Sequence, residues 1–196
     1  MLDNLAGYNI ILASNSPRRN DLMNGLGIKY TVHTLKDVDE SYTSDLKGGD
    51  IAQFIASRKA DAFRRKMQPN DLVITADTIV CIGDEVLGKP IDKADAVRML
   101  KLLSGKSHWV YTGVCITSRR AQKSFTAATE VVFAPLTEEE ILWYVDHYKP
   151  SDKAGAYGVQ EWIGYVGVER ISGSYYNVMG LPVHQLYTEL NNYEPF

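Results

Sequence analysis

The chain has 196 residues, of which 45% are hydrophobic and 23% charged, and its 21 Lys and Arg against 24 Asp and Glu leave a net charge of −3. This size suits one domain or a tight two-lobed unit whose core needs no disulfide or metal. The balance excludes an overall basic nucleic-acid-binding surface, but not a local basic pocket for a small anion. No apolar stretch approaches the roughly 20 residues that span a bilayer. No signal-peptide pattern occurs, so we expect the cytoplasm.

The hydrophobic pattern predicts short strands alternating with helices, which is typical of an α/β fold. In chain order we expect a strand at 9–13, a helix from 16, a strand at 30–35, a helix at 50–67, a strand at 72–76, a hairpin over 78–87, a helix at 92–103, a hairpin of strands 108–117 and 124–133, a helix from 137 to about 148, a strand at 163–168 and a helix from 182. Because hairpins interrupt the parallel alternation, we expect a mixed sheet rather than a Rossmann fold.

The first candidate site is the segment Ser14–Arg19, where a strand runs into a helix that begins at Ser16 and Pro17. A helix N-terminus offers free backbone N–H groups and a positive dipole end. Hydroxyls and the guanidiniums of Arg18 and Arg19 would add charge-assisted donors for a polyphosphate. The segment alone is also compatible with an ordinary Ser-Pro helix start carrying solvated arginines.

A second candidate is Asp77, which we place at the carboxyl end of the strand 72–76. Ligands of open α/β sheets bind at this end, and a carboxylate there can hold Mg²⁺ and orient water. A turn Asp that closes a strand is the commoner alternative. The acidic run Asp37–Glu40 follows another strand and could supply metal ligands or be a solvated loop.

The segment Gly83–Pro90 nearly spells a P-loop, but Pro90 has neither the hydroxyl nor the N–H that this motif needs. We reject a P-loop and keep Lys89 as a phosphate contact. The polar segment 152–160 has the length of a functional loop, in which Gln160 could contact a base edge; the alternative is a flexible connection. Lys59 lies on the expected helix 50–67, whose basic residues mostly suit a solvated face.

The sequence motifs of other catalytic and metal-binding sites are absent from the sequence. The four histidines are scattered singly, and neither G-x-S-x-G nor G-x-G-x-x-G occurs. Cys81 and Cys115 lie in apolar runs without C-x-x-C spacing, so we expect buried thiols rather than a disulfide or a zinc site.

The order of these motifs is specific. Leu12–Arg19, Ala76–Thr78, Leu87–Pro90, Leu103–Gly105, Asp152–Gln160 and Gly173–Pro182 follow one another along the chain. This arrangement resembles the Maf family of nucleoside triphosphate pyrophosphatases over nearly the whole chain.

The resemblance implies a single Maf-like domain over residues 1–196, with a two-lobed α/β fold of the inosine-triphosphatase-like type: an elongated mixed sheet flanked by helices, and a central cleft. It implies hydrolysis of a nucleoside triphosphate at the α–β anhydride to the monophosphate and pyrophosphate, a divalent cation (Mg²⁺ or Mn²⁺), and a homodimer. It also implies house-cleaning of non-standard nucleotides and a link to septum formation. Neither a nucleic-acid partner nor a membrane is expected.

The resemblance also assigns roles. Asp77 would be the general base, Glu40 and Asp77 would hold the metal, and Lys59 would complete the catalytic set. Charge on the phosphates would be stabilised by Lys59 together with Ser14, Arg18, Arg19 and Lys89.

Base selection would fall to Arg18, Thr78 and Gln160, which match the dTTP/UTP group of the family rather than the 7-methyl-GTP group. One departure is Glu161-Trp162, since the family usually has Gly after the Gln. Two other classes remain open: a nucleotide-binding regulator without catalysis, and a single-stranded nucleic-acid binder that uses Arg18 and Arg19.

Overall fold

The computed structural model describes residues 2–34 and 38–194. The chain forms two compact units. Unit 1 comprises Met1–Asp77, Thr112–Ala127 and Gly180–Phe196, and unit 2 comprises Thr78–Tyr111 and Ala128–Met179. Three long strands contribute residues to both units: β3 (Asp71–Ile82), β5 (Ser107–Thr117) and β6 (Gln122–Phe133).

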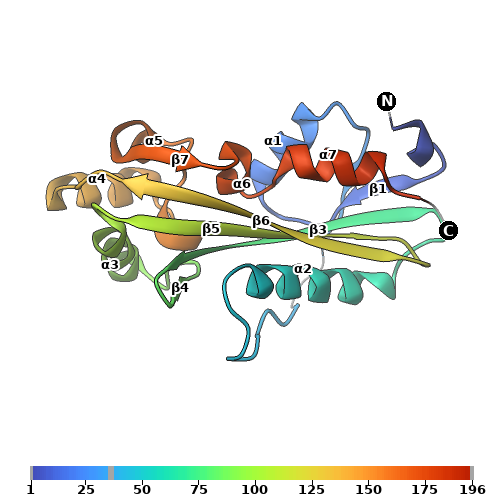
Figure 1. Ribbon diagram of the computed structural model, residues 1–196, viewed down its shortest axis with the longest axis horizontal. Helices are drawn as coiled ribbons and strands as arrows, with labels where there is room; N and C mark the ends of the chain where they lie inside the picture. The colour runs from blue at the N-terminus through green and yellow to red at the C-terminus, as the bar shows by residue number, and fades with distance from the viewer. Residues whose placement is uncertain (1, 35–37, 195–196) are drawn as a thin grey trace. The chain divides into compact units, whose positions relative to one another are not determined.

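The remaining elements belong to one unit each (Figure 1). Unit 1 has η1 (Asp3–Leu5), β1 (Asn9–Leu12), α1 (Pro17–Gly25), β2 (Thr31–Val32), α2 (Gly49–Arg64) and α7 (Val183–Asn191). Unit 2 has β4 (Glu85–Leu87), α3 (Lys93–Leu103), α4 (Glu138–Tyr148), η2 (Ala154–Ala156), α5 (Trp162–Gly167), β7 (Val168–Ser172) and α6 (Tyr175–Met179).

The sheet is mixed, as the hairpins predict. Its order is β2-β1-β3-β5-β6-β7, with β4 paired to β3. β1 lies parallel to both β2 and β3, whereas the β3–β4 and β6–β7 pairs are antiparallel. The α/β prediction is therefore confirmed, and among the described residues no helix is long and apolar enough to cross a bilayer.

Four predicted strands differ from the structure. The strands expected at 72–76 and 78–82 are one continuous strand, β3. The strand expected at 163–168 is wrong: residues 162–167 form helix α5, because an apolar run of this length with two glycines does not distinguish a buried strand from a helix. The strand expected at 30–35 is reduced to β2, and its Leu35 lies outside the described residues.

In unit 1, helix α2 covers one face of the sheet, and α1 and α7 lie on the other (Figure 1). Small side chains let α2 approach closely: Ala56 and Ala60 are fully buried and pack with Cys115 of β5. Gly113 of β5 faces the backbone of Ala52, to which a Cβ at position 113 would approach to 2.3 Å. The small residues at this contact therefore allow the axis of α2 to lie close to the sheet.

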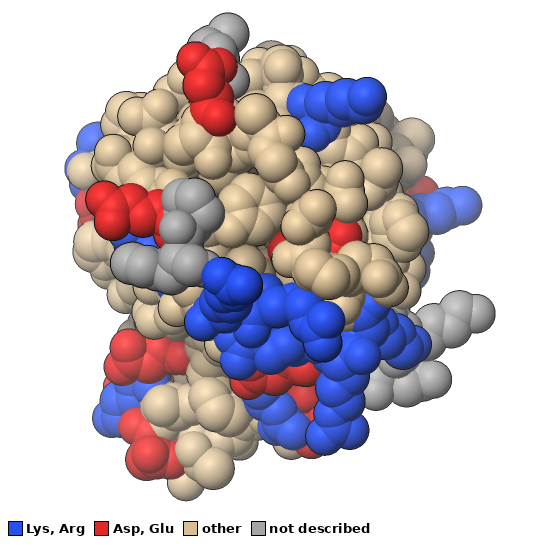
Figure 2. Space-filling model, turned by 90° about the vertical axis from the view of Figure 1, so that its right-hand side faces the viewer, with Lys and Arg blue, Asp and Glu red and all other residues tan. Residues whose placement is uncertain are grey.

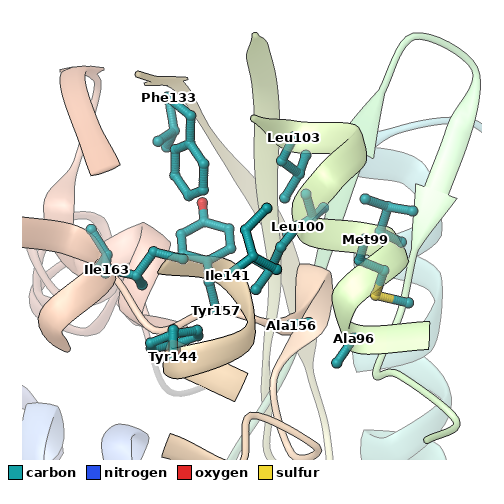
Figure 3. Close-up of a cluster of buried hydrophobic side chains, with 14 of the residues drawn as sticks. Ala96, Met99, Leu100, Leu103, Phe133, Ile141, Tyr144, Ala156, Tyr157 and Ile163 are labelled. Carbon is teal, nitrogen blue, oxygen red and sulfur yellow. The ribbon is translucent and has the colours of Figure 1, made fainter. Parts of the chain in front are cut away.

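In unit 2, α3 and α4 pack on the sheet around one apolar core, into which η2 and the segment after it also insert (Figure 3). Tyr157 points toward Phe133, and their ring centroids lie 4.9 Å apart. The Tyr157 hydroxyl is hydrogen-bonded to His108 Nε2 at 2.8 Å. The segment 152–160 is thus anchored in the core, which argues against a flexible connection.

His108 makes the stability of the fold depend on pH. Burial lowers the pKa of His108 from 6.5 to about 4. Between these pH values His108 takes up a proton in the unfolded chain but not in the folded chain. Its contribution to the free energy of unfolding is therefore complete above pH 6.5 and is lost as the pH falls through 4. We expect a loss of about 3 kcal/mol from this group. In urea unfolding, His108→Gln should lose less stability between pH 7 and pH 4 than the wild type; equal losses would contradict the assignment.

The charge of the chain is unevenly distributed. At one end of unit 1, where α2 ends and the β5–β6 turn lies, Lys and Arg side chains gather on the surface (Figure 2). The exposed basic residues of these two segments are Arg64, Arg65, Lys66, Arg119, Arg120 and Lys123. Lys123 is ion-paired with Glu189 of α7. None of the predicted site residues belongs to this group.

Candidate active site

The site begins where β1 leads into α1. Ser16 is the N-cap of α1, its Oγ accepting a hydrogen bond from Arg19 N at 3.4 Å, and Pro17 occupies the first helical position. Ser14 Oγ accepts from Ser16 N at 3.2 Å and from Arg19 Nη1 at 3.5 Å. The predicted Ser-Pro helix start is confirmed, and it brings Ser14 and Arg19 together.

Arg19 is the most constrained cation of the site. Its Nε donates to Gly180 O at 2.7 Å, which ties α1 to the segment before α7. Desolvation lowers the pKa of Arg19 below its usual value, and the carboxylates of Asp77 and Glu40 partly oppose this shift. Arg18 acts on the same guanidinium as a like charge. Arg19 therefore lies within electrostatic reach of both predicted carboxylates.

Lys59 joins the two carboxylates. Its Nζ lies 2.7 Å from Asp77 Oδ1 and 2.9 Å from Glu40 Oε1. The exposed fractions of the side chains are 18% for Lys59, 13% for Asp77 and 50% for Glu40. The predicted catalytic set of Glu40, Lys59 and Asp77 thus forms one contiguous cluster that stays open to solvent on the Glu40 side.

One buried contact between β3 and α2 places Lys59 there. Thr75 Oγ1 of β3 donates to Ala56 O of α2 at 2.7 Å, in a fully buried position. Lys59 lies about one turn after Ala56, and Asp77 lies two residues after Thr75 on the same side of β3. The register between helix and strand therefore brings the ammonium to the carboxylate.

Asp77 does not lie at the end of its strand, which corrects the prediction. It lies in the middle of β3, where it and Thr78 are the two half-exposed interior positions of the strand. The neighbouring strand β1 ends first: Leu12 pairs with Ile74, and Ala13 N donates to Ile74 O at 2.9 Å. Since β1 then turns away into α1, the carboxylate of Asp77 gains access from that side although β3 continues.

Arg58 is a site residue that sequence reasoning missed. Its Nη2 lies 2.8 Å from Asp39 Oδ2, and its Nη1 donates to Ser41 O at 2.8 Å. Hydrogen bonds from Ser41, together with the Arg58 charge, lower the pKa of Asp39. Arg58 thus holds the two neighbours of Glu40, on a segment without regular structure. We find no sequence signal for this clamp, since its partners lie far apart in the chain; Asp37 of the same acidic run lies outside the described residues.

The other three predicted residues belong to unit 2. Thr78 follows Asp77 in β3, so its side chain points to the opposite face. Lys89 is exposed in the loop after β4, where Gly155 N donates to Gly88 O at 3.1 Å. Gln160 lies in the turn before α5, half-buried. Within unit 1, the structure brings together the six predicted residues of that unit: Ser14, Arg18, Arg19, Glu40, Lys59 and Asp77.

The donor set suits a hard divalent cation. Mg²⁺ is usually held by one or two carboxylates, with waters and substrate phosphates completing its shell. Glu40 and Asp77 provide two carboxylates that both contact Lys59 Nζ. Within the described ranges, no group of three His, Cys, Asp or Glu side chains is arranged around a common point. The residues fit a cation that also needs the phosphates of a substrate, and not an all-protein metal cage. The cysteines are both buried and free, as expected.

Comparison with known proteins agrees with the motifs. The family model described as "Maf-like protein" matches residues 9–193. The chain belongs to the Maf family. Among curated relatives, a protein of Bacteroides thetaiotaomicron named dTTP/UTP pyrophosphatase is 64% identical over 97% of this chain and 98% of its own length. A protein of Porphyromonas gingivalis with the same name is 49% identical over 98% of both chains.

The fold of this Maf protein is shared beyond its sequence relatives. A solved Ham1 protein from Coxiella burnetii superposes with a TM-score of 0.53 at 15% identity, covering 95% of this chain and 100% of the other. The Ham1 protein of Staphylococcus aureus gives 0.50 at 16% identity, covering 92% and 99%. At such low identity the likeness concerns the fold alone, and it confirms the predicted fold type.

Proposed function

We propose that this Maf protein hydrolyses dTTP and UTP at the α–β phosphoanhydride, giving the nucleoside monophosphate and pyrophosphate. That it is a nucleoside triphosphate pyrophosphatase follows from relatives that carry such a name over nearly their whole length. The observation that carries the proposed reaction is the Glu40–Lys59–Asp77 cluster beside Arg19, which joins anionic and cationic groups at one open position.

Each residue of the cluster has its own role in the attack of water on phosphorus. Hydrolysis is slow at neutral pH because anionic oxygens repel the nucleophile, so a site must neutralise charge and aim the water. Asp77 accepts the proton of the attacking water. Lys59 orients the Asp77 carboxylate and, with Arg18, Arg19 and Lys89, stabilises charge on the phosphates. Ser14 and the backbone N–H groups at the start of α1 complete the phosphate contacts.

A divalent cation is part of this proposal. Glu40 and Asp77 would hold Mg²⁺ or Mn²⁺, which supplies charge neutralisation at the phosphate oxygens when bound. Arg58 keeps Glu40 in place by holding Asp39 and Ser41.

The choice of base rests on Arg18, Thr78 and Gln160. A pyrimidine presents few edge groups, and an amide that both donates and accepts matches the imide edge of uracil or thymine. The name dTTP/UTP pyrophosphatase, which both of these relatives carry, supports this choice. The homodimer, the cytoplasmic location, the absence of a nucleic-acid partner and the link to septum formation stay predictions.

A substrate panel tests the proposal. With Mg²⁺ or Mn²⁺, dTTP and UTP should release pyrophosphate and the monophosphate at least about tenfold faster than 7-methyl-GTP, and EDTA should stop the reaction. Orthophosphate as the first product would contradict cleavage at the α–β bond. Faster turnover of 7-methyl-GTP would overturn the choice of base, and no turnover of any triphosphate would favour a binding regulator.

A further inference from the structure

Glu161, which directly follows Gln160, is part of a buried polar network in unit 2. The Tyr144 hydroxyl donates to Glu161 Oε2. On the other oxygen, Glu161 Oε1 lies 3.1 Å from Lys153 Nζ. Lys153 Nζ also lies 2.8 Å from Asp152 Oδ1. The network therefore joins α4 to both ends of the segment 152–161.

The side chains of this network are largely buried, so its charged groups must stay paired. The exposed fractions are 9% for the Lys153 side chain, 17% for Glu161 and 0% for Tyr144. An ammonium in such a position requires carboxylate partners, because an unpaired buried charge is costly. Loss of the Glu161 charge would leave Lys153 with Asp152 alone, whose side chain is 52% exposed.

The same network fixes the turn that carries Gln160. Gly158 N donates to the Tyr144 hydroxyl at 3.0 Å, and Glu161 N donates to Gly158 O at 2.9 Å. A Cβ on Gly158 would lie 3.0 Å from Gln160 Nε2 and 2.8 Å from Glu161 Cδ. The Gln160 amide therefore rests on the bare Cα of Gly158, inside a turn whose first and last residues both contact Tyr144.

The amide oxygen of Gln160 lacks a donor. Gln160 Oε1 is enclosed, and within residues 2–34 and 38–194 it has no hydrogen-bond partner. A buried carbonyl oxygen of this kind requires a donor to offset its desolvation. The N3–H group of uracil or thymine is such a donor, whereas N3 of cytosine carries no hydrogen.

We propose that Glu161 is a positioning residue for base selection: through Tyr144 and Lys153 it holds the turn from which the Gln160 amide contacts the imide edge of uracil or thymine. This rests on the proposed function, since it requires a pyrimidine triphosphate as substrate. Trp162 supports the same turn, its ring centroid lying 4.7 Å from that of Trp143 of α4. Glu161 and Trp162 therefore both anchor the turn to α4.

The test compares kinetics with UTP and CTP. Glu161→Gln should raise KM for UTP about tenfold, leave kcat within about twofold, and lower the ratio of kcat/KM for UTP over CTP by about tenfold. Glu169→Gln is the matched control, because Glu169 is an exposed glutamate of β7 in the same unit. An unchanged UTP/CTP ratio in a folded Glu161→Gln protein would overturn the proposal.

A second variant covers the case in which Glu161→Gln does not fold. Tyr144→Phe removes the hydroxyl that contacts both Gly158 and Glu161 but keeps the ring in the core. It should shift the ratio in the same direction, and an unshifted ratio there would equally overturn the proposal. If the wild type released no pyrophosphate from any triphosphate, the proposed function would fail. If the wild type were active and both variants kept its base preference, only the role of Glu161 would fail.

Discussion

Asp77→Asn should reduce pyrophosphate release from dTTP and UTP by at least about a thousandfold, because the amide can neither accept the proton of the attacking water nor hold a cation as a carboxylate does. The fold should survive the change. Lys59 keeps its contact with Glu40 at 2.9 Å, and Asn has nearly the volume of Asp. The measurement is the initial rate of pyrophosphate release at saturating substrate and Mg²⁺.

The control for this prediction is Asp84→Asn, since Asp84 is an exposed carboxylate in the β3–β4 turn. This variant should keep the wild-type rate. Thermal unfolding of both variants near the wild-type temperature would show that the loss is chemical. Near-normal turnover by Asp77→Asn would exclude Asp77 as the base.

Gly113→Ala should strongly destabilise unit 1. The new Cβ would lie 2.3 Å from the backbone of Ala52 and of Gln53, well inside contact distance. Neither backbone can rotate away as a side chain would, so α2 must move from the sheet. We expect a loss of about 2–3 kcal/mol in the free energy of unfolding, measured in urea.

The matched control is Gly25→Ala, because a Cβ at Gly25 meets no atom within 4 Å, and Gly25 ends α1. It should leave stability unchanged or raise it slightly. Gly113→Ala should in addition lower the rate of pyrophosphate release, since displacement of α2 carries Lys59 away from Asp77. A stable, fully active Gly113→Ala protein would show that the helix has room to yield.

Helix starts and hairpins were predictable because their signals are local. Ser16 caps α1, Asp92 caps α3 by accepting from Asp95 N at 2.8 Å, and Thr137 with Glu140 forms the expected capping box of α4. Each signal needs only residues three positions apart. The antiparallel pairing of β3 with β4 follows in the same way from the turn at Gly83 and Asp84.

The features that were predicted wrongly or missed depend mostly on residues distant in the chain. Asp77 looked like a strand end because two polar residues interrupt an apolar run; β3 continues past them because it is paired with β5 and, at Val80–Ile82, with β4. Helix α5 looked like a strand because periodicity is uninformative over six residues. Gly113 carried no local signal, since its role depends on the backbone of α2.

The candidate site, too, was only partly predictable from local signals. The motifs named Ser14, Arg19, Lys59 and Asp77, which the structure brings together, but the motifs gave no reason why Glu40 should reach Lys59. That reason is Arg58, whose two contacts with Asp39 and Ser41 can be seen only in three dimensions. Similarly, the sequence singled out Glu161 as a departure from the family pattern, but it did not predict the contacts of Glu161 with Tyr144 and Lys153.

Strand β3 places Asp77 as the last residue of unit 1 and Thr78 as the first of unit 2. The proposed proton acceptor and a proposed base-selecting residue are therefore covalent neighbours, yet they belong to separate packing environments. Apart from Arg18, the other proposed determinants of base choice also lie in unit 2, whereas the charged cluster lies in unit 1. Exchanging the segment 152–162 between relatives should therefore change the proposed base choice while leaving the proposed Glu40–Lys59–Asp77 cluster in place.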